Sequence, residues 1–517
     1  MKLLLTTLNS KYVHTNLALK YLYCAGKEMA AGDGGGAEIE LREFTINNDM
    51  NYVYGEIIRG SYDCVCFSCY IWNIEKVLNL TADLKKAQPS MKILLGGPEV
   101  SYGRRTLMEN CPWIDYIIRG EGEHPFSRFC CKLKESSAWL SEGDLPEIPA
   151  LTYRDENGDI CETAQGMLLP MEEVPFPYKE LPPEQDKVVY YESSRGCPYR
   201  CSYCLSSLDK SIRALPVEDT CRHLGFFLSQ KVKQVKFIDR TFNFDLTRAK
   251  EIWQYLIEQD NGITNFHFEL CGELLDDQAF SLLEKARQGL FQFEIGIQSC
   301  NDRTLAAVDR KEQVMPILDN VRRLIAMGNC HVHVDLIAGL PYEDYESFGR
   351  SFDLVYGLQA DNLQLGFLKL LKGTKIRKET ENYDYVFRSR APYEVIANKC
   401  MGAEEMVRLK MIENVLDLYA NKGGFEQSLD FLIEKVSDRP FSFFEKFADY
   451  FYDQGFQHRS HKKEDLYRIL RKFAKSMDQE FSGILEHAEK LISQDLEETM
   501  NFDAVKKFYK KGWEING

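Results

Sequence analysis

Residues 196–204 read GCPYRCSYC, and this stretch contains three closely spaced cysteines. Cys197, Cys201 and Cys204 have the spacing C-x3-C-x2-C. Three thiolates on one tight loop can hold three irons of a [4Fe–4S] cluster and leave the fourth iron without a protein ligand. Chemistry can take place at such an open iron. The stretch therefore predicts an iron–sulfur cluster that is held by these three cysteines.

A structural zinc loop is the alternative interpretation of the three cysteines. Tetrahedral zinc needs a fourth Cys or His at close spacing. The next candidates, Cys221 and His223, lie in a segment with helical periodicity, so the cluster interpretation is favoured. Most of the 16 cysteines are expected to be reduced thiols, and the clustered trio predicts a reducing, low-oxygen setting.

Length and composition limit the class of protein. A chain of 517 residues can hold two or three domains, and 44% hydrophobic with 28% charged residues is typical of a globular protein. No stretch has the apolar length of a membrane span, and residues 1–5 resemble a buried strand and not a signal peptide. We therefore expect a cytoplasmic protein. The net charge of −15 makes a nucleic-acid partner unlikely.

The first 135 residues alternate short apolar strands with helical segments, which predicts a doubly wound parallel sheet. The strands are expected at residues 2–6, 37–43, 64–68, 92–95 and 116–119. Ligands bind at the carboxyl ends of strands in such α/β sheets. The turns after the strands should therefore line one crevice for a large, flat ligand, with candidate contacts at Ser10, Tyr12, Cys69, Tyr70, Trp72, Gly96, Gly97, Glu99, Gly120 and Glu121.

A connector and a second α/β region follow. Residues 136–187 contain a hairpin pattern around the turn at 156–158 and then a stretch with Pro175, Pro177, Pro182 and Pro183, which predicts an extended strap. Residues 188–384 contain six strand patterns separated by amphipathic helices, at 188–192, 235–239, 267–270, 291–297, 332–337 and 362–370. Six such units predict an incomplete parallel (β/α)6 barrel with its functional groups at the carboxyl ends of the strands.

The periodicity becomes helical beyond about residue 385. Helical patterns cover residues 393–418, 425–436, 441–452, 463–477 and 481–491. We therefore expect an all-α C-terminal domain over residues 385–517. Its many Phe and Tyr residues are typical of packing, and no motif assigns it a role.

The cysteine stretch, with Arg195-Gly196 before it and Tyr203 before the last cysteine, resembles the signature of the radical S-adenosylmethionine (SAM) superfamily. Residues 294–299 (EIGIQS) and 333–341 (HVDLIAGLP) resemble its fourth- and fifth-strand motifs. The resemblance implies that SAM binds the open iron. It also implies SAM contacts from the barrel strand ends and the cysteine loop, at Tyr203, Asp239, Glu269 and Gln298. The Gly-Gly-Glu common at the second strand is replaced by FIDRTF at 237–242.

The N-terminal third resembles the cobalamin-binding domain that precedes radical SAM domains in some members. The matching turns are LLGGPEVS at 94–101 and RGEGE at 119–123, and QLGFLKLLKGT at 364–374 resembles the last barrel strand of these members. The resemblance implies that cobalamin occupies the predicted crevice. No Asp-x-His-x-x-Gly is present, so cobalt is expected without a histidine lower ligand.

The resemblance implies a cobalamin-dependent radical SAM methyltransferase. Its substrate would be an unactivated carbon or phosphorus of a small molecule or natural-product intermediate. One SAM would methylate the cobalamin and a second would generate the radical that abstracts hydrogen from the substrate. An electron donor such as flavodoxin or ferredoxin would reduce the cluster. The catalytic residues that act on the substrate are unknown from the sequence.

Three alternatives remain open. Other members use the same parts for ring formation or rearrangement. A sensor could bind cobalamin and SAM without a reducible cluster. An RNA thiomethylase would need a second cluster on Cys64, Cys66 and Cys69. The alternation of Cys64 and Cys66 within one apolar strand favours core packing for them instead.

Overall fold

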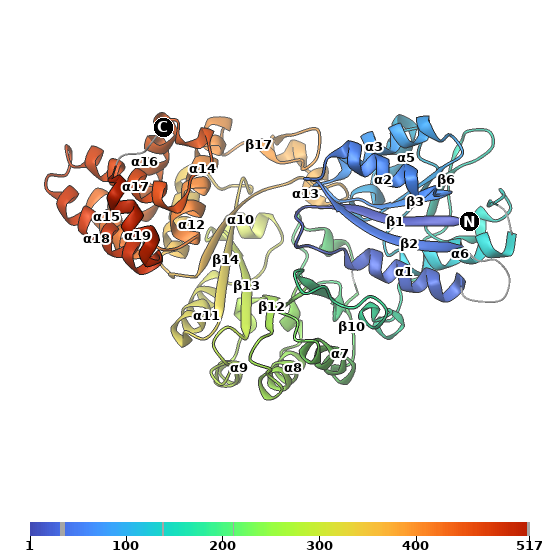
Figure 1. Ribbon diagram of the computed structural model, residues 1–517, viewed down its shortest axis with the longest axis horizontal. Coiled ribbons are helices and arrows are strands. Elements are labelled where there is room, and N and C mark those ends of the chain that lie inside the picture. The colour runs from blue at the N-terminus through green and yellow to red at the C-terminus, as the bar shows by residue number, and fades with distance from the viewer. Residues whose placement is uncertain (31–36, 137–138, 210, 514–517) are drawn as a thin grey trace.

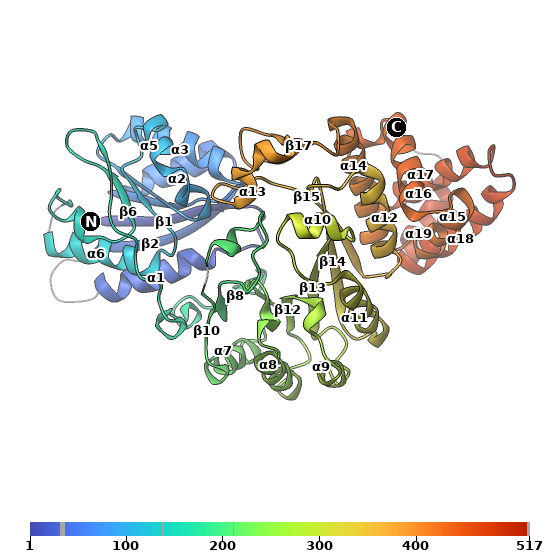
Figure 2. The same ribbon diagram turned by 180° about the vertical axis from the view of Figure 1, so that it is seen from behind.

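The structure is a computed structural model that describes residues 1–30, 37–136, 139–209 and 211–513. Three parts follow one another along its longest axis, as Figure 1 shows. They are an N-terminal α/β domain, a central partial barrel and a C-terminal group of helices. Figure 2 shows the same order from behind. None of the helices in the described ranges has the length and apolar character needed to cross a membrane.

The N-terminal sheet has seven strands in the order β2-β1-β3-β4-β5-β6-β7. Five are parallel, and they are β1 (Lys2–Asn9), β2 (Glu38–Thr45), β3 (Cys64–Ser68), β4 (Lys92–Gly96) and β5 (Tyr116–Ile118). Apolar cores lie on both faces of the sheet. Helices α1 (Leu17–Ala30) and α6 (Glu123–Ser136) cover one face, and α2 (Met50–Gly60), α3 (Ile74–Ala87) and α5 (Arg104–Asn110) cover the other. This confirms the predicted doubly wound sheet.

The predicted hairpin of the connector is part of this sheet. Strand β6 (Leu151–Arg154) pairs antiparallel with β5 and with β7 (Ile160–Glu162). Leu151 is fully buried, so the hairpin extends the sheet over an edge that would otherwise expose unpaired backbone groups. Only the proline-containing segment after the hairpin acts as a strap to the barrel.

The central region is a six-stranded parallel sheet in the order β15-β14-β13-β12-β11-β8, which confirms the partial barrel. Its strands are β8 (Val189–Tyr191), β11 (Gln234–Phe237), β12 (Asn265–Leu270), β13 (Phe291–Gln298), β14 (His331–Ala338) and β15 (Asn362–Phe367). Its outer face is covered by α7 (Val217–Ser229), α8 (Leu246–Glu258), α9 (Asp277–Leu283), α11 (Val314–Met327) and α12 (Tyr345–Tyr356), with the shorter α10 (Asp302–Ala307) after β13. A short antiparallel pair, β9 (Ser194–Arg195) and β10 (Arg213–Ala214), brackets the cysteine loop.

The C-terminal helices are α14 (Ala403–Leu416), α15 (Glu426–Val436), α16 (Pro440–Asp453), α17 (Lys463–Met477), α18 (Ile484–Thr499) and α19 (Phe502–Lys511). The prediction that the helical pattern begins at residue 393 was wrong. Residues Val395–Ala397 form β17, which pairs antiparallel with β16 (Val386–Phe387). The same segment also meets the chain after β15, since the backbone N–H of Val395 bonds to the Leu368 carbonyl and the N–H of Leu370 bonds to the Tyr393 carbonyl. Pairing with the chain beyond the last barrel strand overrides the local helical pattern.

The helical region covers the open edge of the barrel at β15. The side chain of Asn421 accepts a hydrogen bond from the backbone N–H of Leu363 at 2.9 Å and donates one to its carbonyl at 3.0 Å. This amide therefore takes the place of a further strand. On the neighbouring helix α12, Asp353 binds Arg439 and the backbone N–H of Phe441.

Candidate functional site

The turns predicted to bind a flat ligand lie at one end of the first sheet. They follow β1, β3, β4 and β5, which run parallel, so their carboxyl ends meet at the same edge. The strand order reverses between β1 and β3: β2 lies beyond β1 on one side, and β4 lies beyond β3 on the other. Ligands of doubly wound sheets bind at this switch point. The turns with Ser10 and with Cys69 flank it directly.

Aromatic side chains are exposed at this edge. Tyr70 and Trp72 stack with their ring centroids 4.4 Å apart, and Trp72 remains 44% exposed. Tyr12 is 67% exposed and packs under the Lys187 ammonium of the strap. Exposed, stacked aromatic rings are suited to contact a large flat ligand.

The glycine turn after β4 packs tightly against the turn after β3. Gly97 has φ +100°, and a Cβ atom there would lie 2.6 Å from the Cys69 carbonyl oxygen. The backbone N–H of Cys69 in turn bonds to the Gly96 carbonyl at 2.8 Å. Cys69 is fully buried, and burial raises the pKa of its thiol. Cys69 therefore helps to shape the edge through its backbone, as Gly120 does by donating its N–H to Ser101 Oγ at 3.0 Å.

Two residues that are predicted to contact the flat ligand interact with residues of the barrel region in this structure. Glu99 is 3% exposed, forms an ion pair with Lys372 at 2.7 Å and accepts a hydrogen bond from the Tyr393 hydroxyl. Glu121 forms ion pairs with Arg195 and Arg213. Contact of either carboxylate with cobalamin stays a prediction. The contacts present in the structure fasten the first domain to the barrel.

The three cysteines lie on the loop between β9 and the 3-10 turn Leu205–Leu208, at the carboxyl end of the barrel. Ser202 fixes this loop, because its N–H bonds to the Val308 carbonyl and its carbonyl accepts from the Ile376 N–H. Cys197 and Cys204 are half-buried and Cys201 is 7% exposed. Within the described ranges, no three Cys, His, Asp or Glu side chains converge closely enough to hold a metal ion. The prediction that the trio holds a cluster is carried by the donor set and its position.

Two arginines lie close enough to the cysteine loop to interact with its thiols. The pKa of Arg240 is raised: removal from water lowers it, but Glu269, Cys204, Glu192 and Cys197 raise it by more. Burial raises the pKa of Cys201 to about 11, and Arg310 opposes this shift. Cationic neighbours favour the charged thiolate over the thiol. The sequence prediction missed both arginines, although Arg240 directly follows Asp239 at the end of the second barrel strand.

Gln298 has strained geometry at the carboxyl end of β13. Its φ is +71°, which is uncommon for any residue other than glycine, and the pairing of β13 with β14 is irregular between Gly296 and Gln298. Its Oε1 atom is buried and has no hydrogen-bond partner within the described part of the chain. Strain of this kind is concentrated at functional sites. An amide oriented in this way suits a polar group such as SAM.

The other predicted SAM contacts lie around the same barrel end. Glu269, near the end of β12, has its pKa raised to about 7, because burial outweighs the attraction of Arg240. Tyr203 packs against the barrel core. Asp239 is fully buried and accepts hydrogen bonds from Ser193 N at 2.8 Å and from the Ser193 and Ser194 hydroxyls at 2.6 Å each. These bonds indicate that Asp239 shapes the chain ahead of the loop, and its contact with SAM stays a prediction.

Polar side chains line the inside of the barrel. Glu294 on β13 binds Lys236 of β11 at 3.1 Å and His267 of β12 at 3.0 Å. These partners lower the pKa of Glu294 to about 2 despite its burial. Asp335 on β14 has its pKa raised to about 8 by burial, with Glu294 and Glu269 adding to the shift. The interior thus combines a fixed ion pair with a carboxyl group that is protonated at neutral pH.

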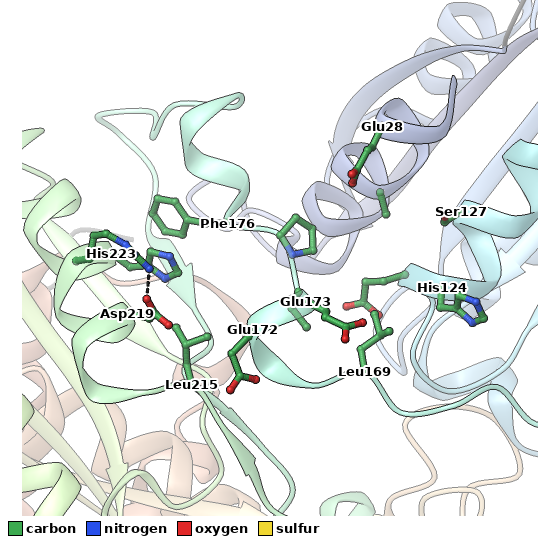
Figure 3. Close-up of a pocket in the computed structure, with 15 residues that line it drawn as sticks. Glu28, His124, Ser127, Leu169, Glu172, Glu173, Phe176, Leu215, Asp219 and His223 are labelled. Atoms are coloured by element: carbon green, nitrogen blue, oxygen red, sulfur yellow. Dashed lines mark hydrogen bonds and ion pairs between the residues drawn. The ribbon is translucent and has the colours of Figure 1, made fainter. Parts of the chain in front are cut away.

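A separate cavity of about 400 Å³ lies between α1, α6, the strap and α7, and it is drawn in Figure 3. Its wall contains several carboxylates, among them Glu28, Glu172 and Glu173, together with His124 and His223. None of the three loop cysteines lines it. The cavity is therefore not the cysteine site.

Comparison with known families agrees with this layout. Residues 4–129 match the B12 binding domain, and residues 191–355 match the radical SAM superfamily. The chain therefore contains a region that matches a B12-binding domain, followed by a region that matches a radical SAM domain. Residues 381–514 match a family described as a protein of unknown function (DUF4080). The cofactors implied by the two named domains are SAM, a [4Fe–4S] cluster and cobalamin.

Relatives with assigned names cover part of the chain. An uncharacterized methyltransferase, PH0819, of Pyrococcus horikoshii is 27% identical over 56% of this chain and 63% of its own length. The cobalamin-dependent radical SAM methyltransferase TokK of Streptomyces tokunonensis is 25% identical over 55% of this chain and 44% of its own. The chain thus spans about half the length of the curated relatives it matches.

Solved structures share the fold over more of the chain. The cobalamin-dependent SAM radical enzyme OxsB, with aqua-cobalamin and SAM bound, is 14% identical and covers 99% of this chain and 84% of its own, with a TM-score of 0.65. The radical SAM methyltransferase TsrM of Kitasatospora setae, with cobalamin and a [4Fe–4S] cluster bound, is 16% identical and covers 76% of each chain, with a TM-score of 0.59. At these identities the likeness establishes the fold.

Proposed function

We propose that this chain is a cobalamin-dependent radical SAM methyltransferase that acts on an unactivated carbon or phosphorus of a small molecule. The observation that carries the proposal is the contact between the two predicted cofactor sites. Glu121 of the turn after β5 forms an ion pair at 3.0 Å with Arg195. Arg195 lies two residues before Cys197. The edge that would bind cobalamin and the loop that would bind the cluster therefore face each other, as transfer of a methyl group between cofactor and substrate requires.

Each group of side chains has a role in this proposal. Cys197, Cys201 and Cys204 would hold the cluster, and Gln298 and Glu269 would hold SAM. The turns at the edge of the first sheet would hold cobalamin. When bound, the cofactors supply the radical and the methyl group. The chain itself positions the substrate, excludes water from the barrel and presents the polar interior to substrate groups.

The burial of two N-terminal cysteines and the net charge weigh against an RNA thiomethylase. Cys64 and Cys66 are buried on β3 with their sulfur atoms 3.7 Å apart, and burial raises the pKa of Cys64 well above its ordinary value. Both cysteines lie in a strand whose every residue is buried, which is typical of core packing. The net charge of −15 also disfavours RNA. We infer a cytoplasmic enzyme that takes electrons from a flavodoxin or ferredoxin.

Anaerobic reconstitution tests the proposal. Purified full-length chain is supplied with iron, sulfide and hydroxocobalamin and then with SAM and a chemical reductant. About four irons and one cobalamin per chain are expected, with formation of 5′-deoxyadenosine and S-adenosylhomocysteine. Iron binding without either SAM product would favour the sensor. Deoxyadenosine without S-adenosylhomocysteine would favour ring formation or rearrangement, and about eight irons would favour the thiomethylase.

A further inference from the structure

The approach to the cysteine loop passes through a dense group of ion pairs. Arg195 on β9 forms ion pairs with Glu121 at 3.0 Å, Glu123 at 2.6 Å and Glu192 at 2.9 Å. Its side chain is 10% exposed, and that of Glu123 is 7% exposed. Two of the three carboxylates belong to the B12-binding domain, and the third belongs to the barrel. Arg195 thus joins the two domains at a nearly solvent-free point.

A second arginine completes the group. Arg213 on β10 pairs across from Arg195 in the short β9–β10 ladder. It forms ion pairs with Glu121 and with Asp209 and donates a hydrogen bond to the Leu169 carbonyl of the strap. Glu121 therefore bridges the two arginines, and the strap is held at the same place.

This group fixes the start of the cysteine loop. Gly196 is the single residue between Arg195 and Cys197, and its φ is +92°. A Cβ atom on Gly196 would lie 2.0 Å from the Ser211 carbonyl oxygen, so the chain is tightly confined there. Because no flexible segment separates Arg195 from Cys197, the orientation of Arg195 is passed directly to the first cysteine.

We propose that Arg195 is a positioning residue for the cysteine loop, and that Glu121 and Glu123 of the B12-binding domain hold it in place. The B12-binding domain then has a structural task in the iron–sulfur site in addition to binding its own cofactor. The inference rests on the proposed function, because it takes the loop to be the cluster site. Each of the three guanidinium nitrogens of Arg195 lies beside a different carboxylate, and their rigid planar arrangement fixes these directions, whereas a lysine ammonium carries its charge on a single nitrogen at the end of a flexible chain.

Iron release from the reconstituted full-length protein tests this role. The variants are Glu123→Gln and Glu121→Gln, which keep the shape of the side chain and remove its charge. The rate at which a ferrous chelator such as bathophenanthroline removes iron is measured together with the resonance spectrum of the reduced cluster. We expect Glu123→Gln to release iron about tenfold or more faster than the unmodified protein, and Glu121→Gln to show a smaller change in the same direction.

Two controls separate positioning from general loss of stability. Glu172→Gln makes the same change at an exposed carboxylate that has no ion pair within the described ranges, and its release rate should stay within about twofold. Ile252→Val trims a fully buried side chain of α8 in the barrel core, away from the ion pairs. It should lower the melting temperature without accelerating iron release.

The outcomes are distinct. Unchanged release and an unchanged resonance spectrum in both glutamate variants would overturn the inference while leaving the proposed function intact. Failure of the unmodified protein to bind iron would instead refute the cluster itself. If Glu123→Gln does not fold, the rates of iron release from Glu121→Gln and Arg195→Lys test the proposal instead. Faster release from folded Arg195→Lys supports the role, and release at the unmodified rate contradicts it.

Discussion

The parallel strands of the N-terminal sheet and those of the barrel differ in how they are buried. In the first sheet, every residue of β1 after Lys2 is buried, and all of β3 is buried, because helices cover both faces. In the barrel, β13 alternates strictly between buried residues that face the helices and partly exposed residues that line the interior. The first sheet therefore offers a ligand only its edge, whereas the barrel offers both its edge and its polar interior.

Substitutions in the cysteine loop, at the carboxyl edge of the barrel, should have the largest effect on function, because they remove ligands of the cluster. We expect Cys197→Ala, Cys201→Ala and Cys204→Ala each to abolish retention of the cluster, since each thiolate holds one iron. Iron content and visible absorbance after anaerobic reconstitution measure this. Cys300→Ala is the matched control, because Cys300 lies at the end of β13 outside the loop. Four irons retained in any of the three variants would reject the assignment.

A cavity in the first sheet should lower local stability more than the loss of an interior side chain lowers it in the barrel. Leu4 on β1 is fully buried, so Leu4→Ala should destabilise its sheet by about 2–5 kcal/mol. Gln292 lines the barrel and bonds to His333 at 3.2 Å, and Gln292→Ala should cost about 1 kcal/mol. Hydrogen exchange of the peptides that contain β1 and β13 reports each local stability. Equal costs would contradict the difference between the sheets.

Polar residues at the carboxyl ends of the barrel strands should contribute to SAM binding, and a polar residue near the amino end of β13 should not. Gln298→Ala and Glu269→Ala should weaken SAM binding roughly five- to a hundredfold, because each lost polar contact in a partly dry site costs about 1–3 kcal/mol. Gln292→Ala is the control on the same face of β13, toward its amino end, and should leave the affinity unchanged. Titration of SAM into the reconstituted protein measures all three. Unchanged affinity in both test variants would indicate that other strand ends hold SAM.

The polar interior should make the barrel sensitive to alkaline pH. The pKa of folded Asp335 is about 8, above its ordinary value of 3.8, so the folded state binds more protons than the unfolded state between these values. Stability therefore falls as the pH rises through this window. Asp335→Asn should reduce the fall between pH 6 and 9 by about 2 kcal/mol. Urea unfolding followed by hydrogen exchange of β14 measures it, with the exposed Asp83→Asn as the control, and identical pH profiles for the two variants would exclude Asp335 as the cause.

Local patterns were sufficient to predict the architecture. The alternation of strands and helices in both α/β regions follows from apolar runs, and the position of the cysteine loop follows from its place after the first barrel strand. Short-range signals failed where a distant segment supplied the partner. Residues 393–397 have a helical pattern but pair with the chain at Leu368–Leu370, and the hairpin at 151–162 joins the first sheet.

The sequence by itself determined the chemistry that is available: three thiols at C-x3-C-x2-C spacing, glycine turns after apolar strands, and polar residues at strand ends. Only the tertiary structure decided which groups meet. Arg195 pairs with Glu121 and Glu123 across more than seventy residues of chain, and Gln298 acquires its φ of +71° from irregular pairing with β14. The physical reason is that side-chain type and spacing are local properties. Ion pairing, burial and backbone strain depend on segments that only the folded chain brings together.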